Sequence, residues 1–95
     1  YPVIVEATSG PSGSPTLAGY NTMKEAYDAI NAGIHQGVVV VKVYANTTET
    51  GTATLNNSGV GSASYTSVTI QAIAGVTISG SASPVMILGQ EAVNP

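Results

Sequence analysis

The chain has 95 residues, which is enough for one small domain with a single hydrophobic core. Only Lys24 and Lys42 are basic, and five acidic residues give a formal net charge of −3. This balance excludes nucleic-acid binding, which needs clustered Lys and Arg, and it argues against docking on an anionic membrane surface. The longest apolar run, Val38–Val41, is far too short to cross a membrane, so membrane insertion is not expected.

Composition favours a secreted β-protein. Cysteine is absent, which removes disulfides, thiolate metal sites and cysteine nucleophiles. Charged residues make up 7% of the chain, whereas Ser and Thr occupy 21 positions and Gly another 11. Such a surface is polar through hydroxyls and amides, and this pattern is common in secreted bacterial β-proteins. We therefore expect an extracellular or cell-surface location.

The N-terminal segment predicts one strand and a long loop. Apolar residues alternate in Tyr1–Ala7, and Pro2 favours an edge position for this strand. The segment Ser9–Gly19 is rich in Gly, Pro and Ser, so it is expected to be a connection without a fixed core role.

One amphipathic helix is predicted over about residues 22–32. Thr22 can cap its first turn while Glu25 reaches back to the backbone N–H of the cap. Gly33 suits the left-handed residue that ends a helix. An apolar stripe, which must be buried, is formed by Met23, Ala26, Tyr27 and Ile30.

The rest of the chain predicts short strands between polar turns. After a turn at Ile34–Gly37, Val38–Ala45 is the strongest strand; with Lys42 facing water, it turns alternate valines inward, namely Val39, Val41 and Val43. A polar turn at Asn46–Gly51, a strand at Thr52–Leu55 and a loop at Asn56–Ser64 follow. Three brief strand units then recur at spacings of 8 and 9 residues: Val68–Ile70, Val76–Ile78 and Val85–Ile87.

One helix followed by brief strands favours a mostly-β fold, a short right-handed parallel β-helix (solenoid) with an N-terminal capping helix. The whole chain, residues 1–95, would then be one domain. Residues 1–37 would supply the strand, loop and helix of the cap, and residues 38–95 would supply the β coils.

These residues also resemble a known group of proteins. The strand Val3-Ile-Val5-Glu-Ala7 and the helix Thr22–Ile30 resemble the N-terminal cap of right-handed parallel β-helix proteins, the pectate-lyase-like group that includes pectin methylesterases. The stretch 31–78, with Asn46–Glu49 and Gly61–Ile70, is similar to large β-strand-repeat surface proteins of Bacteroidetes-type bacteria. The resemblance implies a solenoid and a surface role. It carries over no catalytic residue, because the chain has no Arg and only one Asp.

No motif predicts catalysis, a cofactor or a metal. The acids are scattered over a strand, the helix surface, a turn and the tail, where solvated structural roles are expected: Glu6, Glu25, Asp28, Glu49 and Glu91. His35 is alone in the turn after the helix and is expected to be a polar surface residue without a metal partner. A Gly-x-Ser-x-Gly elbow, a complete phosphate-binding glycine loop and a calcium repeat are all missing from the sequence.

The sequence favours two function classes, and a third, a pectinolytic enzyme, would require the chain to be a fragment that lacks the catalytic coils. In the first, the uncapped last coil exposes strand edges, so the chain is a structural or adhesive module at a bacterial cell surface. It would be continued by further β-helix coils, or it would bind itself head-to-tail into fibres by strand exchange. Candidate self-association residues are Val3, Ile4, Val5, Val85 and Ile87.

In the second class, the chain is a carbohydrate-binding module of a polysaccharide-degrading enzyme. Tyrosine rings can stack on sugar faces, and the hydroxyl adds a polar contact. Tyr20, Tyr44 and Tyr65 are the candidate glycan contacts, whereas Tyr27 belongs to the buried face of the helix.

Overall fold

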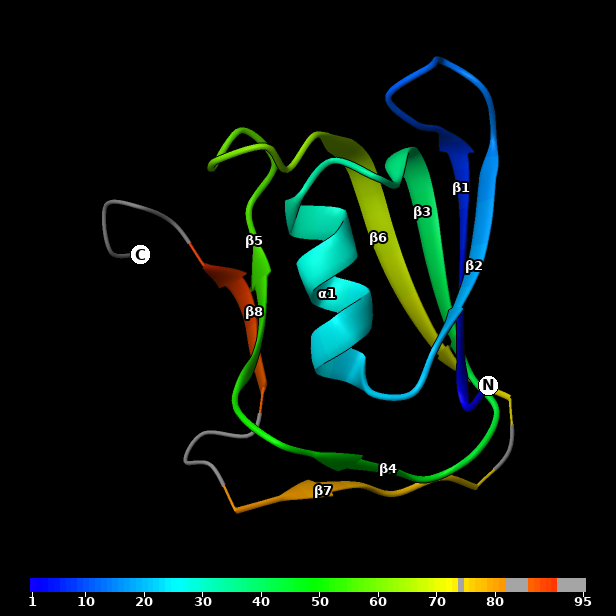
Figure 1. Ribbon diagram of the computed structural model, residues 1–95, viewed down its shortest axis with the longest axis vertical. Coiled ribbons are helices and arrows are strands. Elements are labelled where there is room, and N and C mark those ends of the chain that lie inside the picture. The colour runs from blue at the N-terminus through cyan, green and yellow to red at the C-terminus, as the bar shows by residue number, and fades with distance from the viewer. Residues whose placement is uncertain (74, 82–85, 91–95) are drawn as a thin grey trace.

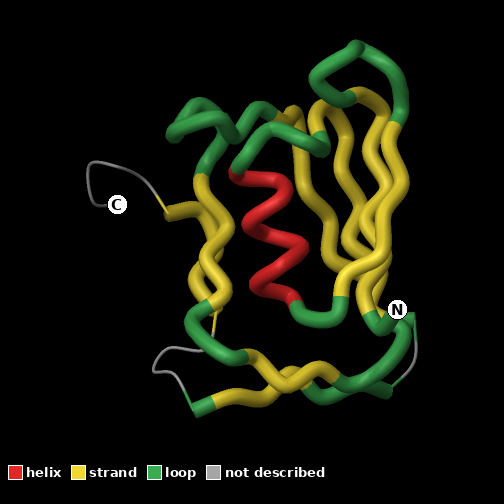
Figure 2. The backbone as a smooth tube through the Cα atoms, viewed as in Figure 1, coloured by secondary structure: helices red, strands yellow, loops and turns green. Residues whose placement is uncertain are grey.

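The computed structural model describes residues 1–73, 75–81 and 86–90 (Figure 1). These residues form a helix and short strands (Figure 2). In chain order, the elements are β1 (Val3–Ser9), β2 (Thr16–Tyr20), α1 (Met23–Asn31), β3 (Gln36–Val43), β4 (Thr47–Glu49), β5 (Ala53–Asn56), β6 (Tyr65–Ala72), β7 (Ile78–Gly80) and β8 (Met86–Gln90). The described residues include no helix with the length and apolar character needed to span a membrane.

The strands form one mixed sheet and two smaller sheets. The larger sheet has the order β2-β1-β3-β6, in which β1 is antiparallel to both of its neighbours and β6 is parallel to β3. The other two sheets are the parallel pairs β4–β7 and β5–β8. In Figure 1 these three sheets stand on three sides of α1.

The prediction of a β-helix is wrong. The chain forms a small mostly-β domain with a mixed four-stranded sheet, and no solenoid is seen in the part that the structure describes. The later strands fall in three separate sheets, because β6, β7 and β8 pair with β3, β4 and β5. Short strands between small residues specify strand length, and they leave the pairing partner open.

Three local predictions are also wrong. The strand β1 lies inside its sheet, since it pairs with β2 on one side and β3 on the other; Pro2 precedes the strand and removes no ladder hydrogen bond. The expected loop Ser9–Gly19 contains β2, in which Leu17 faces solvent. The expected turn Asn46–Gly51 contains β4.

The helix begins and ends nearly as predicted. The Thr22 hydroxyl accepts a hydrogen bond from the Glu25 N–H at 3.1 Å. The Glu25 carboxylate accepts from the Asn21 N–H at 3.1 Å, one residue before the expected position. Gly33 has a φ of +81°, and its N–H donates to the Ile30 carbonyl at 3.0 Å. Its left-handed geometry closes the helix as the sequence indicates.

A single core joins the helix to the strands. The predicted register of β3 is confirmed, because alternate valines are buried while Lys42 and Tyr44 face outward. The helix therefore packs within the core of the domain instead of closing the end of a solenoid. The buried cluster contains Val3, Val5, Ala7, Met23, Ala26, Tyr27, Ile30, Val39, Val41, Val43, Ala53 and Leu55.

Candidate functional site

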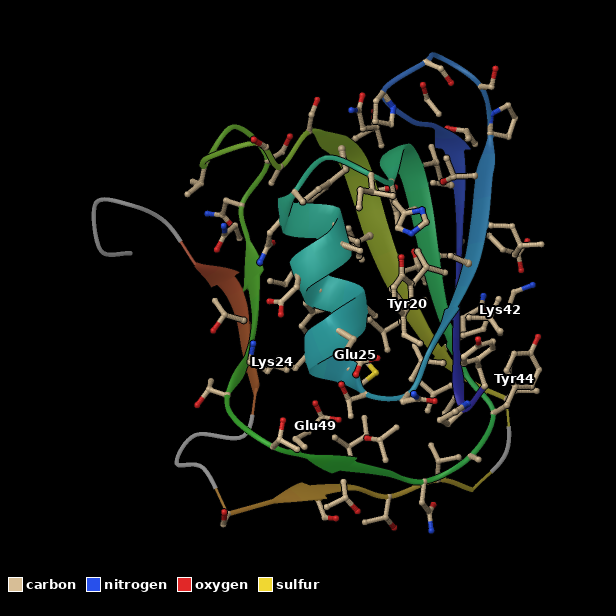
Figure 3. The ribbon with its side chains drawn as sticks, in the orientation of Figure 1. Tyr20, Lys24, Glu25, Lys42, Tyr44 and Glu49 are labelled. Atoms are coloured by element: carbon tan, nitrogen blue, oxygen red, sulfur yellow. The ribbon has the colours of Figure 1, made fainter. Side chains whose placement is uncertain are left out.

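The three tyrosines predicted to contact a glycan lie in different surroundings. Tyr20 ends β2 and packs against the core (Figure 3). Tyr65 begins β6, also packs against the core, and donates its hydroxyl hydrogen to the Asn56 carbonyl. Tyr44 follows β3 and is 45% exposed. The two partly buried tyrosines thus direct their hydroxyls to internal partners.

His35 is buried, contrary to the sequence expectation. Only 1% of its surface is exposed. Its Nδ1 lies 2.6 Å from the Thr16 hydroxyl oxygen, and its Nε2 lies 2.8 Å from the Tyr20 hydroxyl oxygen. Burial lowers the pKa of His35, which favours the neutral ring. Since both ring nitrogens are occupied, the ring serves to hold β2 against the turn that precedes β3.

Glu49 is the second buried ionisable group that the sequence did not reveal. It is 3% exposed, and its carboxylate accepts from the backbone N–H groups of Met23 at 3.0 Å and Lys24 at 2.8 Å. The Thr47 hydroxyl donates to the same carboxylate at 2.7 Å. The negative charge thus sits at the positive end of α1, where helix N–H groups lack intrahelical partners. Glu49 joins β4 to the start of the helix (Figure 3).

Asn31 makes the equivalent junction at the other end of the helix. Its side-chain NH₂ donates to the Thr54 carbonyl at 2.8 Å, and its side-chain oxygen accepts from the Asn56 N–H at 2.8 Å. The amide therefore bonds to β5 as the backbone of a neighbouring strand would. This closes the side of β5 that faces α1.

The buried polar groups are bonded within the fold. No described buried side-chain nitrogen or oxygen lacks a hydrogen-bond partner. Within the described ranges, no group of three or more His, Cys, Asp and Glu side chains could hold a metal ion. Two charged pairs lie on the surface, Lys24 with Asp28 and Lys42 with Glu6.

The strands β6, β7 and β8 lie on the side of β3, β4 and β5 that other described strands leave uncovered. We use the name outer strand layer for β6, β7 and β8, residues 65–72, 78–80 and 86–90. Among the described residues, each of these strands pairs on one side only, with β3, β4 or β5. One row of backbone N–H and C=O groups in each strand thus has no strand partner there.

Side chains of β6 that face the core are incompletely covered. In the register, Val68 lies beside Val39 and Ile70 beside Val41, so both point inward. Val39 and Val41 are fully buried, but Val68 is partly exposed and Ile70 is 36% exposed. Ile73, just after β6, is 49% exposed. The core is therefore open toward the outer strand layer.

The outer strand layer is also uncharged. Residues 50–90 contain no Asp, Glu, Lys, Arg or His. Exposed strand edges in monomeric proteins are commonly blunted by charged side chains, Pro or bulges. The eight residues of β6 include neither a charge nor a proline, and five of them are Tyr, Thr, Val or Ile, the strand-favouring types. This is the composition of a strand suited to pairing with another chain.

The candidate self-association residues do not lie together in the structure. Val3 and Val5 are fully buried in β1, and Ile4 lies between them in the same doubly paired strand. Ile87 lies in β8, in register with Thr54, whereas Val85 lies outside the described residues. The sequence placed the free edge on the last coil and gave the N-terminal strand as the one that another copy would add, and it did not single out β6.

The described residues also line hollows on the surface, of which two are considered. One, of about 320 Å³, is lined by uncharged residues at the start of β3 and β6: Ser9, Gln36, Gly37, Ser64, Tyr65 and Thr66. The other, of about 300 Å³, lies on the outer face of the four-stranded sheet beside Glu6, Ala7, Thr8, Pro15, Val38 and Val40.

No known protein family, curated protein or solved structure matches this chain. The functional conclusion therefore depends on the geometry of the outer strand layer.

Proposed function

We propose that this chain is a non-catalytic structural or adhesive module at a bacterial cell surface, and that it assembles with further copies through the outer strand layer. One observation carries the proposal: β6, β7 and β8 are uncharged strands, each with one edge that has no strand partner among the described residues, above a core that is only partly covered. Strand addition to such an edge supplies backbone hydrogen bonds and apolar burial together.

The free edge of β6 can be assigned residue by residue. The Ile73 N–H donates to the Val43 carbonyl at 2.9 Å, so odd-numbered residues of β6 direct their peptide groups toward β3. Val68, Ile70 and Ala72 then direct theirs to the open side. A strand added here would pair these groups and would cover the exposed part of Ile70.

Association can be tested by placing a lysine on this edge. Thr69 is exposed on β6, and Thr48 is an exposed threonine on β4, outside the outer strand layer. Light scattering and electron microscopy over a concentration series should show mass increasing with concentration for the wild type. Thr69→Lys should require at least about tenfold more protein to reach the same mass, which corresponds to 1.4 kcal/mol of association free energy.

The matched variant Thr48→Lys adds the same charge elsewhere and should assemble like the wild type. A wild-type chain that stays monomeric at every concentration would overturn the proposal. Equal loss of assembly in both lysine variants would also count against it, because the effect would then come from net charge.

A second candidate function is glycan binding at the uncharged hollow beside Tyr65. Hydroxyl and amide side chains around one aromatic ring suit sugar hydroxyls and sugar faces, and the volume of about 320 Å³ leaves room for a small saccharide. Retention on immobilised neutral polysaccharides, compared between wild type and Tyr65→Ala, tests this candidate. Tyr44→Ala, which changes a tyrosine outside the hollow, is the control and should leave retention unchanged.

A further inference from the structure

We infer that the outer strand layer binds the same layer of a second copy across a two-fold axis, with β7 beside β7 and β6 beside β8 of the partner copy. This inference rests on the proposed function and adds the geometry of the contact. It predicts a closed dimer, whereas the sequence left open head-to-tail fibres or continuation by further coils.

A head-to-tail contact would need a complementary surface on the opposite side of the molecule. There, the second edge of β3 is already paired with β1. The facing edge of β5 is bonded to the Asn31 amide, and β4 is tied to α1 through the Glu49 carboxylate. The remaining outer edge, that of β2, is a single strand of five residues. Among the described residues, three free edges at matching positions are offered only by a second outer strand layer.

The path of the chain fits a two-fold arrangement. In Figure 1, β6 and β8 stand on opposite sides of α1, and β7 crosses between them below the helix. The chain runs toward β7 along β6 and away from β7 along β8. A two-fold axis through the middle of β7 therefore places β6 antiparallel to β8 of the partner copy. It also places β7 antiparallel to its own counterpart, so all three contacts have a favourable pairing direction.

Charge and size permit this contact. Each chain has a net charge of −3, but residues 50–90 contribute none of it, so two facing layers bring no like charges together. The molecule measures 33 × 30 × 17 Å, and Figure 1, which looks down its shortest axis, shows the three strands spread across the broad dimension. A face of this breadth can supply the ~800 Å² per partner of an ordinary stable interface.

Single cysteines provide the test, since the natural chain has no cysteine. Ser79 lies in β7 and Thr77 just before it, and both are exposed. Near the axis, a cysteine meets its own copy, and disulfide formation requires a Cα–Cα distance of roughly 4.4–6.8 Å. Ser79→Cys or Thr77→Cys should give a disulfide-linked dimer under mild oxidation, with mass limited to two chains. Thr48→Cys, in the adjacent strand β4, is the control and should remain unlinked.

The outcomes separate this inference from the proposed function. Cross-linking of a β7 cysteine that disappears when Thr69→Lys is added supports the two-fold contact. Assemblies that grow beyond two chains and cross-link at neither β7 position overturn it, although association through the layer would stand. A wild type that is monomeric at every concentration overturns both. Circular dichroism of each cysteine variant checks that the fold is intact. Ser79→Cys loses only the weak 3.4 Å hydrogen bond from Ser79 to the Thr47 carbonyl.

Discussion

The two sides of the middle strands β3, β4 and β5 differ in how their edges are treated. On the side of β1 and α1, the edges of β3 and β5 are paired or bonded, and the side chains of Glu49, Asn31 and His35 tie strands to the helix or turn. On the other side, within the part of the chain that the structure describes, β6, β7 and β8 each have an edge without a strand partner and carry no charged residue. The first side holds the fold together, and the second is the side through which we propose that copies bind.

The largest loss of stability is expected for Glu49→Ala. The change leaves the N–H groups of Met23 and Lys24 and the Thr47 hydroxyl without their carboxylate acceptor, in a buried place. Hydrogen bonds to charged groups contribute about 1.5–3 kcal/mol each but are not additive, so we expect a loss of about 3–5 kcal/mol in the free energy of unfolding. Urea denaturation measures it.

Glu49→Gln is the matched control, because the amide keeps one acceptor oxygen and should lose about half as much. A loss below about 1 kcal/mol for the alanine variant would mean that the helix start does not depend on β4.

Asn31→Ala should cost less, because its partners are only partly buried. The Thr54 carbonyl and the Asn56 N–H lose their partner, for an expected loss of about 2 kcal/mol. Asn31→Asp keeps the oxygen that accepts from the Asn56 N–H, so its stability should lie between those of the wild type and Asn31→Ala. If the Asn31 amide is what closes the edge of β5 that faces α1, Asn31→Ala also frees this edge. The alanine variant should then form larger assemblies than the wild type. Unchanged assembly size would show that the helix itself shields β5.

Gly80→Ala tests the close approach of β7 to β4. A methyl group at this position would lie 2.9 Å from the Glu49 carbonyl oxygen, whereas one at Gly75 would meet nothing within 4 Å. We expect a loss of about 1–2 kcal/mol for Gly80→Ala from overpacking, and a change within about 0.5 kcal/mol for Gly75→Ala. Thermal unfolding of the two variants compares them. Equal melting temperatures would show that β7 is held loosely.

The smallest effect expected is a pH dependence that comes from His35. Burial lowers the pKa of this ring, so the unfolded chain binds its proton at a higher pH than the folded chain does. The stabilisation is therefore complete above the unfolded pKa of about 6.5 and is lost as the pH falls toward the folded pKa. The slope should not exceed ~1.4 kcal/mol per pH unit, the value for one proton.

Urea denaturation between pH 5 and pH 7.5 measures this slope, and His35→Gln should abolish it. No charged side chain bonds to the ring, whose partners are the hydroxyls of Thr16 and Tyr20. A slope that persists in the glutamine variant would assign the effect to other groups.

The sequence predicted the features that depend on contiguous residues. The helix over Thr22–Gly33 and the inward valines of β3 follow from caps and periodicity, which are local. The partners of the strands did not follow, because a strand pattern specifies which face is apolar but not which strand lies alongside. The burial of His35 and Glu49 was missed because their partners, such as Thr16 and Met23, lie 19 and 26 residues away in the chain.

The sequence predicted that the chain has an uncovered strand edge, but it did not predict that β6 provides one. An uncovered strand edge was expected from the sequence at the last coil, with Tyr1–Ala7 as the strand that another copy would add. The fold pairs this N-terminal strand on both sides. The absence of charge in residues 50–90 was visible in the sequence and would have pointed to β6. This absence of charge indicated a binding surface only once the structure placed β6, β7 and β8 on one side.

Hydrogen exchange of backbone amides, measured on the wild-type chain at low and high concentration, tests the contrast between the two sides most directly. In dilute solution, the amides of α1, β1 and β3 should exchange slowly, whereas the edge amides of Val68, Ile70 and Ala72 should exchange fast. At high concentration, these β6 amides should become protected while those of β1 and β3 stay unchanged. Identical exchange of the β6 amides at both concentrations would contradict assembly through the outer strand layer.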